Sequence, residues 1–360
     1  MNQLFDGTHK KLGFGLMRLP MIGEDVDIPQ LTKMVDLFLA NGFRYFDTAH
    51  GYHNGKSEIA IRECLTKRYP RDSYILTDKL SLHFFQSQEE IRPLFQEQLD
   101  ACGVEYFDFY LMHALSAVRM PHFRQTRAFE TVEQLKAEGK IRHIGISFHD
   151  TAEVLDQILT EYPQIEIVQL QFNYLDYNDP KVQSRKCYEV CRKHHKPVLV
   201  MEPVKGGILA NLPQNAEKTL LELDNRSNAS YAIRYAAGFE GVQMVLSGMS
   251  NLEQMEDNLK TMKDFQPLNL LEQKAISKVT GILRSQEEIP CTGCRYCTEV
   301  CPQKIPIPEI ISQINAKRQN HNTKTIQKYD CIHCGECERI CPQSLDIRNL
   351  LTAAAEELRA

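Results

Sequence analysis

The chain has 360 residues and a formal net charge of −5, which allows about two domains and gives no basic surface for nucleic acid or an anionic membrane. The first eleven residues are polar and no apolar run could span a bilayer, so we expect a cytoplasmic protein without a signal peptide or membrane anchor. Twelve cysteines in such a chain indicate reduced thiols and metal rather than disulfides.

Short apolar runs alternate with longer amphipathic ones from residue 12 to about residue 265. The apolar runs contain few charges, as strands buried on both faces do. The expected strands are Leu12–Leu16, Arg44–Asp47, Ser73–Thr77, Phe107–Met112, His143–Ser147, Glu166–Leu170, Pro197–Met201 and Val242–Ser247. The expected helices are Ile28–Asn41, Ser57–Arg68, Gln88–Cys102, Gln125–Glu138, Thr151–Glu161, Pro180–His194, Asn228–Ala237 and Asn251–Lys263.

Eight strand–helix repeats in about 250 residues predict an α/β protein with a closed (β/α)8 TIM barrel. An open doubly wound sheet is the alternative, and it usually carries a Gly-x-Gly-x-x-Gly turn after its first strand. Gly13-Phe14-Gly15 lies inside a strand pattern and lacks the third glycine. Three further helices are expected at Leu270–Ser285, Ile310–Arg318 and Arg348–Leu358.

Four polar side chains follow three successive predicted strands: Asp47 and Tyr52, then Lys79, then His113. The carboxyl ends of barrel strands meet at one mouth, where active sites lie. A carbonyl reduced by hydride needs a proton, and a free tyrosine with a pKa near ~10 holds its proton tightly. We predict that Lys79, held by Asp47, lowers the pKa of Tyr52 and makes it the general acid. His113 would orient the carbonyl oxygen.

Two cysteine runs share the spacing C-x2-C-x2-C-x3-C-P at an offset of 40 residues. Two-residue gaps let three thiolates of one run reach one cubane cluster, and in two-cluster ferredoxins the last cysteine of each run ligates the other run's cluster. We therefore assign one [4Fe–4S] cluster to Cys291, Cys294, Cys297 and Cys341, and a second to Cys331, Cys334, Cys337 and Cys301. A zinc site, which usually takes its cysteines as two pairs, or a disulfide knot fits this spacing poorly. Residues 288–345 resemble the bacterial two-cluster ferredoxins.

The chain as a whole resembles the aldo-keto reductase superfamily, specifically its members with a C-terminal ferredoxin domain. The matching residues are Gly13-Phe-Gly-Leu-Met-Arg-Leu19, Phe46-Asp-Thr-Ala49 with Tyr52 and Ser57-Glu58, Lys79, His113, Gly145-Ile-Ser147, Gln169, Phe172-Asn173, Met201-Glu-Pro203, Gly206-Gly207, Ser247-Gly248, Glu256 and Asn258. We expect the barrel at residues 1–268, a linking helix at 269–287, a small α+β bacterial-ferredoxin-like domain at 288–347 and a C-terminal helix at 348–360.

The same resemblance implies an extended NAD(P)H across the barrel mouth. Ser147 and Gln169 would bind its carboxamide, and Met17 and Arg18 would border its nicotinamide half. Gly206, Gly207 and Gly248 would let the backbone approach the pyrophosphate, and Asn258 would meet the adenine.

Two residues depart from the family pattern. Phe148 follows Ser147 where many members have Asn, which removes one carboxamide contact. Gln254 stands where many relatives place an Arg near the adenosine phosphate. Because an uncharged amide cannot pair with a 2′-phosphate as Arg does, Gln254 predicts a relaxed or NADH-leaning preference.

The predicted function is NAD(P)H-dependent interconversion of a small carbonyl compound and its alcohol, coupled to electron transfer through the two clusters. Because nicotinamide transfers two electrons as hydride and cubane clusters transfer one, a flavin or a soluble one-electron carrier protein would have to mediate; no fingerprint supports a flavin. The alternatives are an ordinary carbonyl reductase with structural clusters and an electron-transfer subunit without turnover. We expect Ser81–Gln88, Ala114–Arg124, Asn173–Asp179 and the tail to set specificity.

Overall fold

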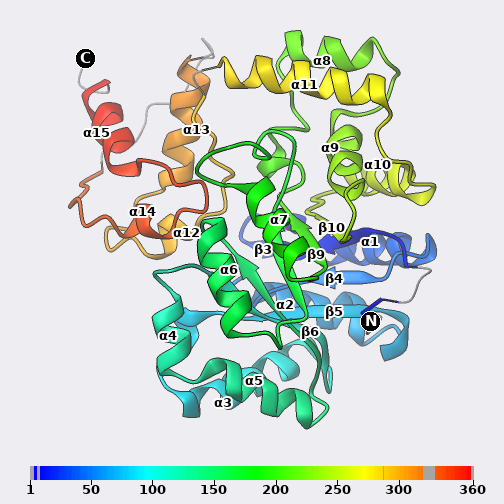
Figure 1. The fold of residues 1–360 in the computed structure, drawn as a ribbon, viewed down its shortest axis with the longest axis vertical. Helices are drawn as coiled ribbons and strands as arrows, with labels where there is room; N and C mark the ends of the chain where they lie inside the picture. Colours follow the sequence, from blue (N-terminus) through cyan, green and yellow to red (C-terminus); the bar gives the residue numbers. More distant parts are fainter. Residues whose placement is uncertain (1–3, 6–8, 287, 319–328, 358–360) are drawn as a thin grey trace.

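The computed structural model describes residues 4–5, 9–286, 288–318 and 329–357. Eight parallel strands close into a barrel in the order β1-β10-β9-β8-β7-β6-β5-β4 (Figure 1). They are β1 (Leu12–Gly15), β4 (Tyr45–Asp47), β5 (Ile75–Leu80), β6 (Phe107–Leu115), β7 (Ile141–Phe148), β8 (Ile167–Gln171), β9 (Val198–Met201) and β10 (Val242–Ser247). The closed strand order confirms the predicted TIM barrel and excludes the alternative, an open doubly wound sheet.

β5 and β6 run three residues further toward the mouth than the sequence predicted. β5 continues past Thr77 to Leu80, and β6 continues past Met112 to Leu115. Lys79 is therefore a strand residue, and its backbone is paired with Leu111 of β6. This rigid placement matters for a side chain that has to be aimed at a single point.

Helices cover the outside of the barrel. They are α1 (Ile28–Ala40), α2 (Lys56–Ile61), α3 (Gln88–Cys102), α4 (Met120–Gln125), α5 (Ala128–Ala137), α6 (Ala152–Glu161), α7 (Ser184–Lys193), α8 (Gln214–Leu221), α9 (Asn228–Ala237) and α10 (Leu252–Lys263). The sequence did not predict α8, nor the hairpin of β2 (Met21–Ile22) and β3 (Asp25–Val26). The single helix expected at Gln125–Glu138 is wrong: Arg127, with a φ of 50°, separates α4 from α5.

The lower part of the barrel interior is filled by side chains. Phe5 closes it from below and stacks on Phe109 with ring centroids 5.2 Å apart. Tyr45, Leu111 and Leu199 belong to the same buried cluster. Since the interior is a packed core, only the carboxyl ends of the strands remain for binding and chemistry.

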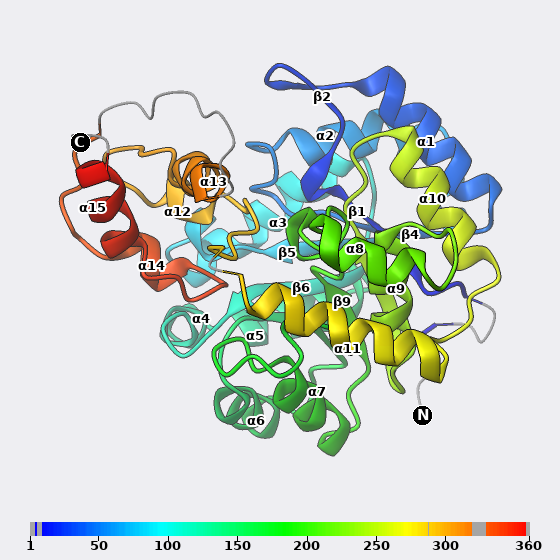
Figure 2. The same cartoon turned by 90° about the horizontal axis from the view of Figure 1, so that it is seen from above.

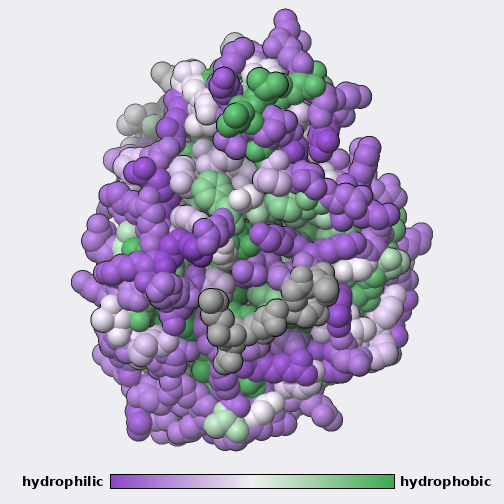
Figure 3. All heavy atoms as spheres, turned by 45° about the vertical axis from the view of Figure 1, so that its right-hand side comes forward, coloured by the Kyte–Doolittle hydropathy of each residue, from purple (hydrophilic) through white to green (hydrophobic). Residues whose placement is uncertain are grey.

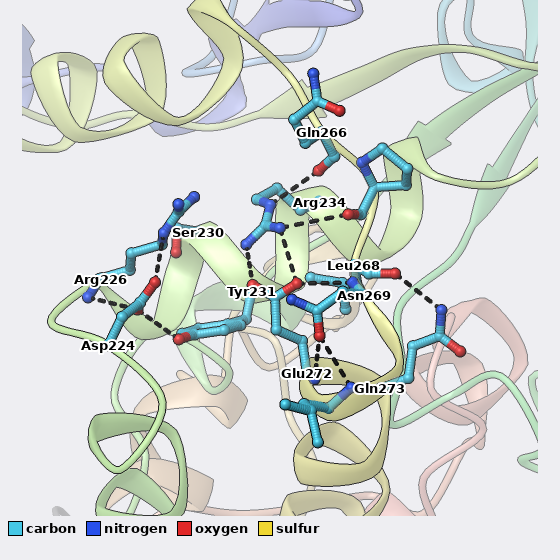
Figure 4. A network of polar contacts seen from close by, with 12 residues as sticks. Asp224, Arg226, Ser230, Tyr231, Arg234, Gln266, Leu268, Asn269, Glu272 and Gln273 are labelled. Atoms are coloured by element: carbon cyan, nitrogen blue, oxygen red, sulfur yellow. Dashed lines mark hydrogen bonds and ion pairs between the residues drawn. The ribbon is translucent and has the colours of Figure 1, made fainter.

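Helix α11 (Leu270–Arg284) carries the chain away from the barrel and is anchored on α9 (Figure 4). The guanidinium of Arg234 donates two hydrogen bonds to the Glu272 carboxylate, at 2.6 and 3.0 Å, and both side chains are buried. Asn269 caps α11 in a capping box with Glu272. These contacts hold the first turn of α11 against α9, so the chain leaves the barrel from a fixed position.

The chain then forms a second, smaller unit beside the barrel (Figures 1 and 2). Its helices are α12 (Tyr296–Glu299), α13 (Ile307–Arg318), α14 (Glu336–Ile340) and α15 (Ile347–Glu357). Its own apolar core includes Ile305, Ile310, Ile311 and Leu351 together with cysteines of both runs. Residues 319–328, between the two cysteine runs, and the end of the helix expected at Arg348–Leu358 lie outside the described residues.

The face shown in Figure 3 is largely hydrophilic, and hydrophobic side chains gather at its top, where α8 and α11 lie. The exposed leucines there are Leu221 at the end of α8, Leu223 just after it, and Leu270 and Leu271 at the start of α11. Among the described residues, no helix combines the length and the apolar character needed to cross a bilayer.

Candidate active site

The four predicted side chains Asp47, Tyr52, Lys79 and His113 meet at the barrel mouth. Lys79 is fully buried, and its ammonium donates to Asp47 Oδ1 at 2.6 Å, to the Thr48 carbonyl at 2.6 Å and to the Tyr52 hydroxyl at 3.2 Å. An ammonium has three protons, so these three acceptors account for all of them. The geometry therefore brings Lys79, Asp47 and Tyr52 together as the sequence predicted.

The pKa of Tyr52 moves in the direction opposite to our prediction. Burial first, and then the negative charge of Asp47, raise the pKa of Tyr52 well above its ordinary value. Lys79 does not reverse this, because its charge is already paired with Asp47 at 2.6 Å. Tyr52 therefore holds its proton at neutral pH, and Lys79 can act only by stabilising the phenolate as it forms.

His113 is kept neutral and is held by Ser81. Burial, and then the charges of Lys79 and Arg119, lower the pKa of His113 well below its ordinary value. Ser81 Oγ lies 2.5 Å from His113 Nδ1. We assign the hydroxyl as the donor, which leaves the ring proton on Nε2. That nitrogen faces the phenol of Tyr296, 3.3 Å away.

Ser147 and Gln169 are placed as a complement to a primary carboxamide. Ser147 Oγ accepts a hydrogen bond from the Ala114 N–H at 2.7 Å, so its hydroxyl proton can donate elsewhere. The Gln169 amide nitrogen donates to Asp47 Oδ2 at 3.0 Å, so its oxygen can accept. One donor beside one acceptor matches a C(=O)NH2 group, and these residues fit the carboxamide of a nicotinamide.

Other residues assigned to the cofactor have different surroundings. Gly206, with a φ of 64°, faces the cluster-binding segment, where an added Cβ would lie 2.5 Å from the Thr292 carbonyl oxygen. Arg18 donates to the same Thr292 carbonyl at 2.6 Å. Asn258 is buried and donates to Ser247 Oγ at 2.7 Å, whereas Gln254 is exposed on the first turn of α10. The Thr292 backbone thus fills the space beside Gly206 where we expected the pyrophosphate.

Two cavities open on the tetrad. A small cavity of about 100 Å³ is lined by Ser147, Gln169, Met17, Gly248 and residues of the tetrad. A large one of about 1200 Å³ is lined by residues of the hairpin β2–β3, of the loops after β4, β5 and β6, and of the segment 293–300. Six residues line both: Met17, Arg18, Tyr52, His113, Cys294 and Tyr296. These six residues therefore form the wall between the two cavities.

The eight cysteines of the two runs gather in two groups. After burial, the nearby Cys341 is a cause of the raised pKa of each of Cys291, Cys294 and Cys297. The remaining cysteines line one enclosed space of about 20 Å³; they are Cys301, Cys331, Cys334 and Cys337. In each group the fourth cysteine comes from the other run, which is the donor set that a cubane cluster needs.

A buried polar network joins the cluster-binding unit to the barrel. Lys205 donates to Asp176 Oδ1 at 2.6 Å and to Gln343 Oε1 at 2.7 Å. Gln343 Nε2 donates in turn to Gln171 of β8 at 2.9 Å. Because all four side chains are buried, their pairing must stay complete for the interface to be stable.

Sequence reasoning missed Tyr296, Thr292 and Gln343. All three lie in or beside the cysteine runs, where the spacing of the cysteines dominates the pattern. The one available signal was Tyr296, which lies in the two-residue gap between Cys294 and Cys297. Because cluster binding needs no large aromatic side chain in that gap, its presence indicates another role.

Comparison with known proteins places these features in a family. Residues 11–280 match the Aldo/keto reductase family, and residues 290–345 match the 4Fe-4S dicluster domain. The chain belongs to the Aldo/keto reductase family.

Individual relatives of this aldo/keto reductase agree with the assignment. It is 28% identical over 188 residues to the NADH-specific methylglyoxal reductase of Escherichia coli, which covers 47% of this chain and 54% of that protein. It is 24% identical over 292 residues to the L-galactose dehydrogenase of Arabidopsis thaliana, covering 76% and 90%. The holo form of aldo-keto reductase AKR11C1 from Bacillus halodurans superposes with a TM-score of 0.61 at 26% identity, covering 75% and 91%.

A pair of buried carboxyl groups supports Lys79 of this aldo/keto reductase from below. Asp78 accepts a hydrogen bond from the Lys79 N–H at 2.7 Å, and Gln98 donates to the Lys79 carbonyl at 3.1 Å and to Glu58 at 3.4 Å. Burial raises the pKa of Glu58 to about 7, and burial together with the charge of Glu58 raises the pKa of Asp78. The pair therefore retains a proton at neutral pH.

This pair predicts a pH dependence of stability. A folded-state pKa of about 7 against an ordinary value of 4.5 stabilises the fold below pH ~4.5, and this contribution is lost as the pH rises through ~7. We expect Glu58→Gln to be more stable than wild type at pH 8.5 by on the order of 1 kcal/mol or more, with less advantage at pH 6. Anaerobic urea unfolding at both pH values measures this.

The matched control is Glu222→Gln, which changes an exposed glutamate and should follow the wild-type pH dependence. Equal pH slopes for Glu58→Gln and wild type would contradict the shared proton.

Proposed function

We propose that this aldo/keto reductase interconverts a small carbonyl compound and its alcohol with NAD(P)H, and that its C-terminal clusters exchange single electrons with a soluble carrier protein. The observation that carries the first part is the buried contact of 3.2 Å between the Lys79 ammonium and the Tyr52 hydroxyl. The nearness of the cluster-binding cysteines to this contact supports the second part.

The residues of the mouth suit reduction at neutral pH. When bound, the nicotinamide supplies a hydride to the carbonyl carbon. Tyr52, protonated because its pKa is raised, gives its proton to the oxygen that becomes an alkoxide, a much stronger base than a phenolate. The product is the alcohol, and the phenolate left on Tyr52 is stabilised by the Lys79 ammonium. Oxidation of an alcohol needs that phenolate first, so it should be favoured only at higher pH.

Each of the other two side chains keeps one task. Asp47 fixes the Lys79 ammonium, because an unpaired buried charge would be unstable there. Neutral His113 offers its Nε2 proton to the carbonyl oxygen, and Ser81 holds the ring in that orientation.

Three observations support a nicotinamide cofactor. Ser147 and Gln169 together complement a carboxamide, and both line the small cavity beside Tyr52. Family membership and the name of the Escherichia coli relative point the same way. Gln254 is exposed and uncharged, so we still predict a relaxed or NADH-leaning preference. Both NADH and NADPH should therefore be used in every assay.

The cysteine groups support two [4Fe–4S] clusters, which supply one-electron transfer when bound. Cys291, Cys294, Cys297 and Cys341 would hold one cluster, and Cys301, Cys331, Cys334 and Cys337 the other. This matches the 4Fe-4S dicluster domain found at residues 290–345.

The general acid is tested by Tyr52→Phe. Loss of the hydroxyl should lower carbonyl reduction by ~10²-fold or more, measured as carbonyl-dependent oxidation of NADH and of NADPH over a panel of small aldehydes and ketones. Tyr188→Phe is the control, because that hydroxyl bonds only the Glu240 carbonyl on the outside of the barrel. Activity of Tyr52→Phe close to wild type would identify another acid.

The cluster ligands are tested by Cys294→Ser. Protein purified without oxygen should fall from roughly eight to roughly four irons per chain, measured by iron and sulfide analysis. Cys187→Ser, in a buried cysteine of α7 outside the two runs, should keep the full iron content. An unchanged iron content in Cys294→Ser would refute the assignment.

A purely structural role for the clusters is the second candidate, favoured by the buried Lys205–Gln343 contact that joins the two units. Cys294 lines both cavities of the active site, which favours the redox role. We expect the visible absorbance of the clusters to bleach at the rate of turnover when NAD(P)H and substrate are added without oxygen. Normal turnover with unchanged cluster absorbance would favour the structural role instead.

A further inference from the structure

We propose that Tyr296, in the first cysteine run, donates a third hydrogen bond to the substrate oxygen, beside Tyr52 and His113. This inference rests on the proposed function, since it assigns a further residue to the same site. It adds a catalytic side chain that comes from the cluster-binding unit and not from the barrel.

The position of Tyr296 is set by the cysteine run. Tyr296 begins α12 between two cysteines assigned to one cluster, Cys294 and Cys297. Arg295, directly before it, has a φ of 66°, a left-handed conformation that a non-glycine residue adopts only where its surroundings fix it. The resulting turn places the phenol against the barrel mouth, where it lines both active-site cavities.

The Tyr296 hydroxyl contacts the two groups that were assigned to the substrate oxygen. It lies 3.3 Å from His113 Nε2, and it lines both cavities together with Tyr52, whose pKa it influences. The His113 and Tyr296 rings meet edge to face, with centroids 6.2 Å apart at 81°. The three side chains therefore lie together at the mouth, and three donors around one oxygen atom would stabilise the negative charge that it gains.

The three donors bind an oxygen atom through hydrogen bonds alone. Tyr52 and Tyr296 are phenols and His113 is neutral because burial lowers its pKa, so the donors themselves bring no positive charge. Their hydrogen bonds strengthen as the carbonyl oxygen becomes an alkoxide, and an interaction of that kind raises kcat more than it lowers KM.

The same contacts have one competing interpretation, in which Tyr296 only fills the oxygen position and has to leave before substrate binds. The two interpretations predict opposite effects of removing the hydroxyl. If the Tyr296 hydroxyl is a donor, its removal weakens binding of the substrate oxygen. If it is an obstruction, its removal strengthens that binding.

Tyr296→Phe keeps the ring and removes the donor. We expect kcat for carbonyl reduction to fall about tenfold or more, with KM changed little, and the iron content to stay at the wild-type level. The second readout needs no turnover: calorimetric titration with sodium acetate, with and without NADP⁺, measures binding of a carboxylate oxygen at the same point. Acetate affinity should fall at least about tenfold in Tyr296→Phe.

Tyr329→Phe is the matched control. It removes a hydroxyl from the same unit, next to the second cysteine run, where the phenol donates to the Leu351 carbonyl at 2.6 Å. It should leave kcat, KM and acetate affinity unchanged.

Three results would overturn the inference. Tighter acetate binding or a lower KM at full kcat in Tyr296→Phe would identify an obstruction, and unchanged values would identify a structural residue. Absence of acetate binding by the wild type would mean that no oxygen site exists. Failure of the proposed function gives a different pattern: the wild type reduces no carbonyl of the panel, while acetate binding still depends on Tyr296.

Discussion

The architecture of the mouth depends on one buried ammonium. Lys79 projects from an internal strand and reaches the Asp47 carboxylate, the Thr48 carbonyl and the Tyr52 hydroxyl. A buried charge persists only when its partners are complete, so strand register, the turn after β4 and the phenol position are all fixed together. The paired charge also explains why Tyr52 is not acidified: the ammonium is neutralised by Asp47, and what remains for the phenol is a directed hydrogen bond.

The cluster-binding unit is part of this site and does more than extend the chain. Thr292 packs on Gly206, Gln343 completes the contacts of Lys205, and Tyr296 reaches His113. These contacts are polar and specific, so the unit is held in one orientation rather than attached by a flexible linker. The site is consequently assembled from two units, each with its own hydrophobic core.

The barrel and the tetrad could be predicted from the sequence because their signals are local. Runs of buried strand residues have a recognisable length, and Asp47, Lys79 and His113 each lie near the carboxyl end of such a run, where the strands of a barrel converge. The direction of the Tyr52 pKa could not be predicted, because it depends on the balance between burial and two opposite charges. A sequence pattern can predict which residues are neighbours, but it does not give the distances between their charged groups.

Contacts between the two units could not be predicted for a related reason. Tyr296 and His113 are 183 positions apart, and no periodicity links residues at that separation. The family resemblance implies a pyrophosphate beside Gly206, whereas the group that approaches this glycine in the structure is the backbone of Thr292. The missed helix α8 and hairpin β2–β3 lie outside the repeat that identified the barrel.

Cys294 and Tyr296, which belong to the cluster-binding unit, form part of the wall between the two cavities. Segment 293–300 supplies Cys294 and Tyr296 to one side of both cavities. The shape of the substrate space in this chain therefore depends on residues outside the barrel. Substrates for this chain have to fit cavities that are lined on one side by residues of the cluster-binding unit.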